Sequence, residues 1–114
     1  MFIPYRSAAV TNSSVVVADK PAKLMAWNIN NLHSAAIFVK FYNSSTAGGA
    51  VVGTTTPFYT LQVAANGSLN TRMLNSPVDP VWFSAGIAIG VVTGGADNNT
   101  TAAATLPIIE LEWI

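Results

Sequence analysis

The sequence predicts an all-β protein: a single-domain, antiparallel β-sandwich of about eight short strands with a jelly-roll-like arrangement. Good helix formers are scarce, whereas β-branched residues, Gly, Asn and Thr are abundant. Clusters of turn-forming residues recur at short intervals, as a sandwich or barrel requires. The length of 114 residues fits one domain, and no linker or internal repeat interrupts it.

In chain order, we expect strands at 14–18, 23–30, 35–42, 51–52, 57–63, 68–74, 82–83, 86–93 and 106–114. Pro21 ends the first, because proline cannot donate to a strand ladder. The second alternates and runs into an Asn-rich turn at 30–34. The third is apolar on both faces, interrupted only by Lys40. A strand with one solvent-exposed face would alternate apolar with polar residues, so this one predicts a second layer over its outer face. A neighbouring subunit is one candidate for that layer.

The second half of the chain follows the same logic. Polar loops are expected at 43–49 and 94–103, and Asn66-Gly67 is a tight-turn signal. The NSPVDP run, with two prolines, predicts a rigid connection. The last strand alternates, so that Glu110 and Glu112 point outward while its apolar residues point into the core.

The N-terminal segment is apolar and bends at Pro4. We divide the chain into an N-terminal arm, residues 1–12, and a β-sandwich domain, residues 13–114. Two interpretations of the arm stay open: a first strand or strap on its own sheet, or an arm laid onto a partner subunit.

Composition indicates a subunit of an assembly. Charged residues make up 9% of the chain and hydrophobic residues 51%, against roughly 25% charged residues in an ordinary soluble domain. The five cationic residues are scattered, so we expect neither a nucleic-acid partner nor a membrane partner. No segment has the run of about 20 apolar residues that a bilayer span needs. The chain has no cysteine, which excludes disulfides, thiolate metal sites and thiol nucleophiles.

Candidate chemistry is weak throughout, and we expect no enzyme, metal or cofactor. Glu110 and Glu112 are neighbours on one strand, whereas the paired acids of glycosidases flank a cleft. His33 is the only histidine and has no acid nearby in sequence. Asp97, Asn99 and Thr101 resemble a calcium loop only faintly. Neither Gly-Gly pair precedes the Lys-Ser/Thr of a phosphate loop.

Aromatic residues are the other candidates, because Trp and Tyr are favoured at protein interfaces as well as in cores. We expect a partner interface that draws on residues of the arm, the third strand and the 82–83 strand. Its members would be Phe2, Ile3, Tyr5, Phe38, Tyr42 and Trp82.

Two stretches carry a resemblance to a known group. The strand LMAWNINN leads into AAIFVKFYN, with VKFYN at 39–43, and a T-G-x-A-D-x-x-T-T pattern lies at 93–101. From Leu24 to the C-terminus the chain resembles small jelly-roll or β-sandwich virion proteins of tailed bacteriophages. The resemblance implies a structural protein, not an enzyme. It points to a capsid decoration or cement protein, often a homotrimer, that binds the major capsid protein and is located in the virion after synthesis in the host cytoplasm.

Alternatives remain beside that expectation. Within the same class, the chain would be a tail or head-fibre component with a host- or carbohydrate-binding surface. Outside that class, a carbohydrate-binding module would use sandwich loops and an exposed Trp82, and a small glycosidase would need Glu110 or Glu112 to act as an acid or base.

Overall fold

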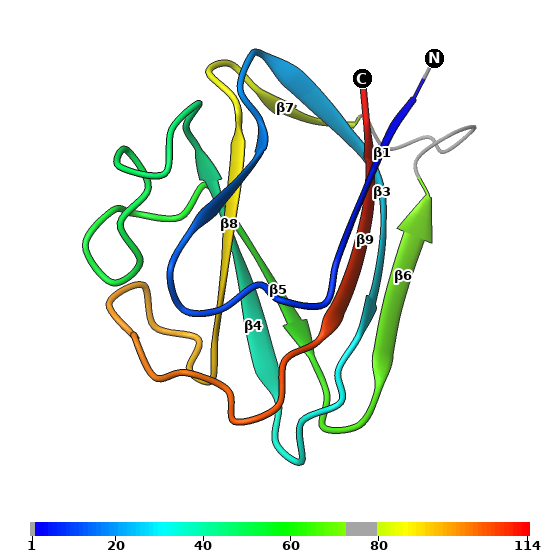
Figure 1. Ribbon diagram of the computed structural model, residues 1–114, viewed down its shortest axis with the longest axis vertical. Helices are drawn as coiled ribbons and strands as arrows, with labels where there is room; N and C mark the ends of the chain where they lie inside the picture. The colour runs from blue at the N-terminus through cyan, green and yellow to red at the C-terminus, as the bar shows by residue number, and fades with distance from the viewer. Residues whose placement is uncertain (1, 73–79) are drawn as a thin grey trace.

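Nine strands and no helix make up the part of the chain that the computed structural model describes, residues 2–72 and 80–114. The strands are β1 (Ile3–Ser7), β2 (Val15–Ala18), β3 (Ala22–Asn30), β4 (Ile37–Asn43), β5 (Tyr59–Val63), β6 (Ser68–Arg72), β7 (Val81–Phe83), β8 (Ile87–Val92) and β9 (Ile108–Trp113). They form two sheets that face each other across the core (Figure 1). Over the same residues, there is no helix long and apolar enough to cross a membrane.

Strand order confirms the predicted antiparallel sandwich and its jelly-roll-like arrangement. Sheet A has the order β1-β9-β3-β6, with β7 paired to β3, and sheet B has the order β2-β8-β4-β5. The antiparallel pairs are nested in sequence, as in one long hairpin: β4–β5 lies within β3–β6, which lies within β2–β8, which lies within β1–β9. Rolling that hairpin so that β9 meets β3 and β8 meets β4 produces the two sheets of a jelly roll.

The core lies between the sheets and follows from the period-two alternation of the strands. On β9, Ile109, Leu111 and Trp113 are buried, and the residues between them face outward. The radius of gyration is 12.9 Å, close to the roughly 13 Å of a compact domain of 100 residues. The described residues therefore form one domain, with the main core between the sheets and a smaller apolar cluster around Tyr42.

The N-terminal segment is the first strand of the domain's own sheet, which is one of its two predicted interpretations. β1 pairs with β9 in a register that sets Ile3 against Trp113 and Ser7 against Ile109. The arm expected at residues 1–12 is thus not separate from the sandwich, because residues 3–7 complete sheet A. The ends of the described chain lie close together at one end of the molecule (Figure 1).

Several element boundaries differ from the prediction. Residues 51–52 form a turn instead of a strand, in which the amides of Thr54 and Thr55 both donate to the Val51 carbonyl. The predicted strand 68–74 is observed as β6, and its last two positions, like residues 75–79 of the NSPVDP connection, lie outside the described residues. The tight turn at Asn66-Gly67 is confirmed, with Asn66 at φ 52°. It connects strands of different sheets, β5 and β6.

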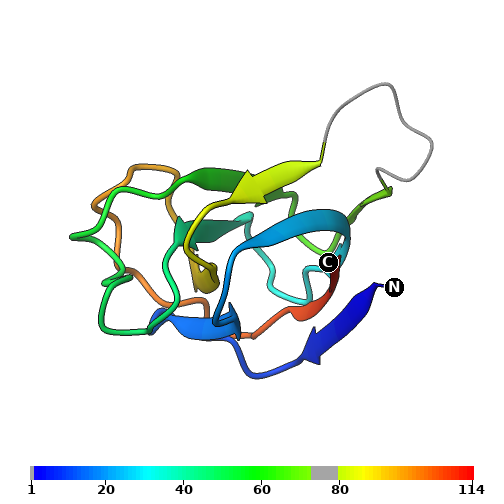
Figure 2. The ribbon, with the colours of Figure 1, turned by 90° about the horizontal axis from the view of Figure 1, so that it is seen from above.

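The second layer over the third predicted strand comes from the chain itself, which corrects the expectation of a neighbouring subunit. Two loops, 44–58 and 93–107, lie beside sheet B on the side away from sheet A (Figure 1, green and orange). The first packs Ala50 and Val52 against Tyr42 and Ala88. From above, the two loops also lie at one end of the molecule (Figure 2).

Candidate functional site

The outer face of sheet A carries a groove of about 610 Å³ lined by residues of four strands. Strand register arranges its outward side chains in two rows that cross the sheet. One row reads Arg6, Glu110, Asn28 and Asn70 from β1 to β6. The other reads Pro4, Glu112, Ala26 and Arg72. Alternation along each strand turns these residues outward, while Tyr5, Trp27 and Leu111 between them face the core.

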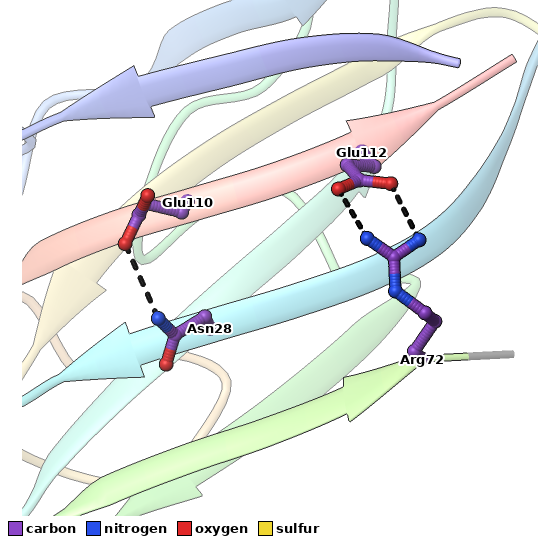
Figure 3. A network of polar contacts seen from close by, with 4 residues as sticks. All are labelled: Asn28, Arg72, Glu110 and Glu112. Atoms are coloured by element: carbon purple, nitrogen blue, oxygen red, sulfur yellow. Dashed lines mark hydrogen bonds and ion pairs between the residues drawn. The ribbon is translucent and has the colours of Figure 1, made fainter. Parts of the chain in front are cut away.

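An ion pair spans the second row. Arg72 donates from Nη1 to Glu112 Oε2 at 2.8 Å and from Nη2 to Glu112 Oε1 at 2.5 Å (Figure 3). The two residues lie on strands separated by β3, and the small side chain of Ala26 stands between them in register. A larger residue at that position would obstruct the guanidinium. The two parallel bonds hold the guanidinium plane in a defined orientation.

An amide chain spans the first row. Asn28 Nδ2 donates to Glu110 Oε1 at 3.2 Å (Figure 3). Asn70 Nδ2 in turn donates to Asn28 Oδ1 at 3.5 Å, which is a weak contact. Glu110 also faces Arg6 directly in the register of β1 and β9. Donors and acceptors thus alternate across the sheet.

The groove gathers an unusual share of the charge of this chain. Both arginines and both glutamates of the sequence lie in it, in a protein with only five cationic and five anionic residues. Their charges balance, so the described residues that line the groove carry no net charge. Sequence analysis placed the two glutamates outward but missed their partners, because Arg72 and Asn28 are distant in sequence and meet them only through strand pairing.

A second feature of sheet A is an apolar band at the end of the sheet where β7 pairs with β3. Trp82 lies opposite Lys23, and Lys23 exchanges two backbone hydrogen bonds with Ile114. Trp82 and Ile114 remain 49% and 45% exposed. Phe58, also exposed, packs against Phe83 with ring centroids 5.1 Å apart. Phe58 itself precedes β5 of sheet B, and its amide donates to the Phe41 carbonyl of β4. We call Trp82 and Ile114 of sheet A, together with Phe58 at the start of β5, the apolar band.

The six predicted interface residues separate into three groups. Trp82 belongs to the apolar band, and Ile3 is exposed on the edge strand β1. Phe2 and Tyr5 are half-buried, and Tyr5 packs against the core. Phe38 and Tyr42 lie on the covered face of sheet B. Phe38 is half-buried near Gly95, and Tyr42 is completely buried, which contradicts its predicted role in partner contact.

The covered face contains a buried lysine that sequence analysis treated only as an interruption. Lys40 Nζ donates to the carbonyls of Gly95 at 2.8 Å and Ala96 at 3.1 Å, which fastens loop 93–107 to β4. Burial lowers the pKa of Lys40, and the nearby Asp97 carboxylate partly opposes this shift. Burial also raises the pKa of the Tyr42 phenol, and Asp97 acts in the same direction.

The remaining candidate residues from the sequence lie in loops that are held by hydrogen bonds within the protein. In the loop that resembles a calcium site, the Gly95 and Ala96 carbonyls accept hydrogen bonds from Lys40 Nζ. In the same loop, Asn99 Oδ1 accepts a hydrogen bond from the Thr101 amide. The His33 amide donates to Asn31 Oδ1. Asn31 is itself buried and donates to the carbonyls of Ala35, Val63 and Ala64. Within residues 2–72 and 80–114, no group of three His, Cys, Asp or Glu side chains is placed to hold a metal ion.

Searches for related proteins found no protein-family model that matches this chain and no curated protein that matches it.

Proposed function

We propose that this chain is a structural virion protein of a tailed bacteriophage, a capsid decoration or cement protein that binds and stabilises the assembled lattice. The sequence resemblance suggests the class, and the jelly-roll sandwich is compatible with it. The single observation that carries the proposal is the apolar band, which leaves Trp82 and Ile114 exposed at one end of sheet A and Phe58 exposed at the start of β5 in sheet B.

The band has the composition of a protein interface. Trp is enriched among the residues that dominate binding free energy, and Phe is enriched at interface centres. Lys23 lies between Trp82 and Ile114 in register and can extend its methylene chain along them while its ammonium stays in water. The chain's own loops cover the outer face of sheet B over β4 and β8 and leave β5 exposed there, so sheet A offers the larger open face to a partner.

The proposed mechanism is mass action. A protein that binds only the assembled lattice stabilises it by an amount set by its concentration relative to its dissociation constant. Binding across a seam between major capsid subunits therefore opposes their separation. A homotrimer is the proposed unit, because a closed ring would bury the apolar band of each copy against the next.

Analytical ultracentrifugation at micromolar concentration tests the trimer. Wild type is expected to sediment as a trimer and Trp82→Ala to shift toward monomer. Leu32→Ala is the matched control, because Leu32 is also exposed but lies beyond the opposite end of β3. A monomeric wild type, or equal effects of the two variants, would count against an interface at the band.

Lattice binding needs its own experiment. Capsids assembled from the major capsid protein of the phage genome that encodes this chain are sedimented with increasing amounts of the protein. Saturable co-sedimentation that raises the temperature of capsid disruption is the expected result. The absence of co-sedimentation would exclude decoration and favour the alternative, a tail or head-fibre component. The open polar groove of sheet A is the observation that keeps this alternative, with its host-binding surface, in consideration.

A further inference from the structure

We infer that the groove on the outer face of sheet A is a binding site for a short, neutral oligosaccharide. The site consists of Asn28, Asn70, Arg72, Glu110 and Glu112, with Arg6 at its β1 side. This inference goes beyond the proposed assembly role and does not depend on it, because no residue of the apolar band lines the groove.

Size and shape support a ligand of several sugar rings. The volume of about 610 Å³ falls within the range of roughly 300–1,000 Å³ typical of ligand sites. Strands are about 4.8 Å apart, so a groove crossing four of them is on the order of 15 Å long. The groove therefore suits an elongated molecule more than a compact one.

The balanced charges of the groove disfavour two other classes of ligand, anionic molecules and apolar molecules. Two guanidinium groups and two carboxylates give the described lining of the site no net charge, and the glutamates occupy β9, in the interior of the sheet. A phosphate or sulfate group would meet these carboxylates, and like charges in contact disfavour binding. An apolar ligand would remove the charged groups from water without replacing their hydrogen bonds, which costs free energy.

A peptide is also a poor fit to this surface. Peptides that add to sheets bind at an open edge, where backbone donors and acceptors are unpaired. The groove instead lies across the face of paired strands and offers side-chain groups. Sugar hydroxyls donate and accept hydrogen bonds alike, so they match a surface on which guanidinium, carboxylate and amide groups alternate.

The polar groups are held in place before any ligand arrives. The paired bonds to Glu112 orient the Arg72 guanidinium, and the bond to Glu110 orients the Asn28 amide. Such orientation lowers the entropy lost when a ligand binds. Pro4 stands beside Glu112 in register on β1, is exposed, and supplies a small apolar surface for the C–H face of a sugar ring.

A glycan array with neutral, sialylated and sulfated oligosaccharides is the first test, followed by NMR titration with cellotetraose, maltotetraose and the tetramer of N-acetylglucosamine. Binding of at least one neutral glycan is expected, with amide shifts concentrated on β3, β6 and β9. Binding of acidic glycans alone, no binding at all, or shifts confined to the loops over sheet B would each overturn the inference.

Variants locate the site. Asn28→Ala is expected to weaken binding by tenfold or more, because it removes the central amide of the row. Asn70→Ala, on an exposed position of β6, is expected to weaken it several-fold and serves if Asn28→Ala folds poorly. Gln62→Ala, which removes an exposed amide from β5 of sheet B, is the matched control and should bind as wild type.

Equal affinity of Asn28→Ala, Asn70→Ala and wild type would overturn the site even if a glycan binds. The groove variants should still form the trimer of the wild type, so failure of glycan binding and failure of the assembly proposal are distinguishable. Thermal unfolding of each variant establishes that lost binding is not lost folding.

Discussion

The two outer faces of this sandwich differ in what covers them. On sheet B, loops 44–58 and 93–107 bury Tyr42 and Lys40 beneath the chain's own backbone. On sheet A, no comparable loop among residues 2–72 and 80–114 lies over the two rows, and the polar groove formed by these residues is open. The comparison teaches that an apolar outer face on a strand does not identify an interface, because a small domain can cover that face itself.

The two outer faces also differ in how exposed their charged side chains are to water. Lys40 lies under the loop, where burial opposes its charged form and two carbonyls stabilise it. The Arg72–Glu112 pair lies in the groove, with Arg72 half exposed to water. The buried cation should therefore matter for the stability of the fold, whereas the exposed pair should matter for binding more than for stability.

Removal of the Tyr42 ring should have the largest effect. Tyr42→Ala is expected to lower the free energy of unfolding by about 3–5 kcal/mol, the cost typical of deleting a buried aromatic side chain. Trp82→Ala, on the open sheet, should change it by less than about 0.5 kcal/mol in the monomer. Urea unfolding at a concentration where the chain is monomeric measures both. Similar values for the two variants would contradict the covered layer.

Replacement of Lys40 should have the next largest effect. Lys40→Met leaves the Gly95 and Ala96 carbonyls without their donor, so we expect a loss of about 1–3 kcal/mol at pH 7. Hydrogen exchange should accelerate at the amides of loop 93–107. Unchanged exchange there would show that Lys40 does not hold the loop.

The same variant tests the pKa of Lys40. Because burial holds this pKa below 10.5 in the folded protein, the unfolded chain binds more protons at Lys40 between the two values. The contribution of Lys40 to stability therefore rises as pH increases toward 10.5. Urea unfolding at pH 7 and pH 10 should show the advantage of wild type over Lys40→Met growing with pH. A shrinking advantage would contradict the sign of the shift.

The Arg72–Glu112 ion pair in the groove should contribute less than Lys40 to the free energy of unfolding. A double-mutant cycle with Arg72→Ala and Glu112→Ala is expected to give a coupling of about 0.2–1 kcal/mol, since exposed pairs lose much of their attraction to water. Unfolding in 1 M NaCl should reduce the coupling further. A coupling that is larger and insensitive to salt would mean that the groove is less open to water than its exposure indicates.

The smallest effect is expected from Tyr42→Phe. Among the described residues the Tyr42 hydroxyl is buried without a hydrogen-bond partner, and a buried unpaired hydroxyl disfavours folding. Its removal should leave the free energy of unfolding unchanged or raise it. A clear loss measured by urea unfolding would reveal a partner for the hydroxyl, such as a bound water.

Much of the fold follows from local patterns. The last strand alternates Ile109, Leu111 and Trp113 with Glu110 and Glu112. Because successive side chains on a strand point to opposite sides, this alternation predicts both its core-facing side and its solvent-facing side. The Asn66-Gly67 turn is also local, since Asn tolerates a positive φ. Local patterns do not predict the groove, because the residues that pair in it are distant in sequence. Arg72 and Glu112 are 40 residues apart, and Asn28 and Glu110 are 82 apart.

The sequence by itself determined the all-β class, the turn at Asn66 and the direction in which each glutamate points, since these depend on neighbouring residues and the two-residue period of a strand. Only the tertiary structure decided that β1 joins its own sheet, that the chain's loops cover Tyr42 and Lys40, and that both arginines join both glutamates in one groove. The reason is that these contacts depend on strand order and register, which are set by how the long hairpin rolls into two sheets.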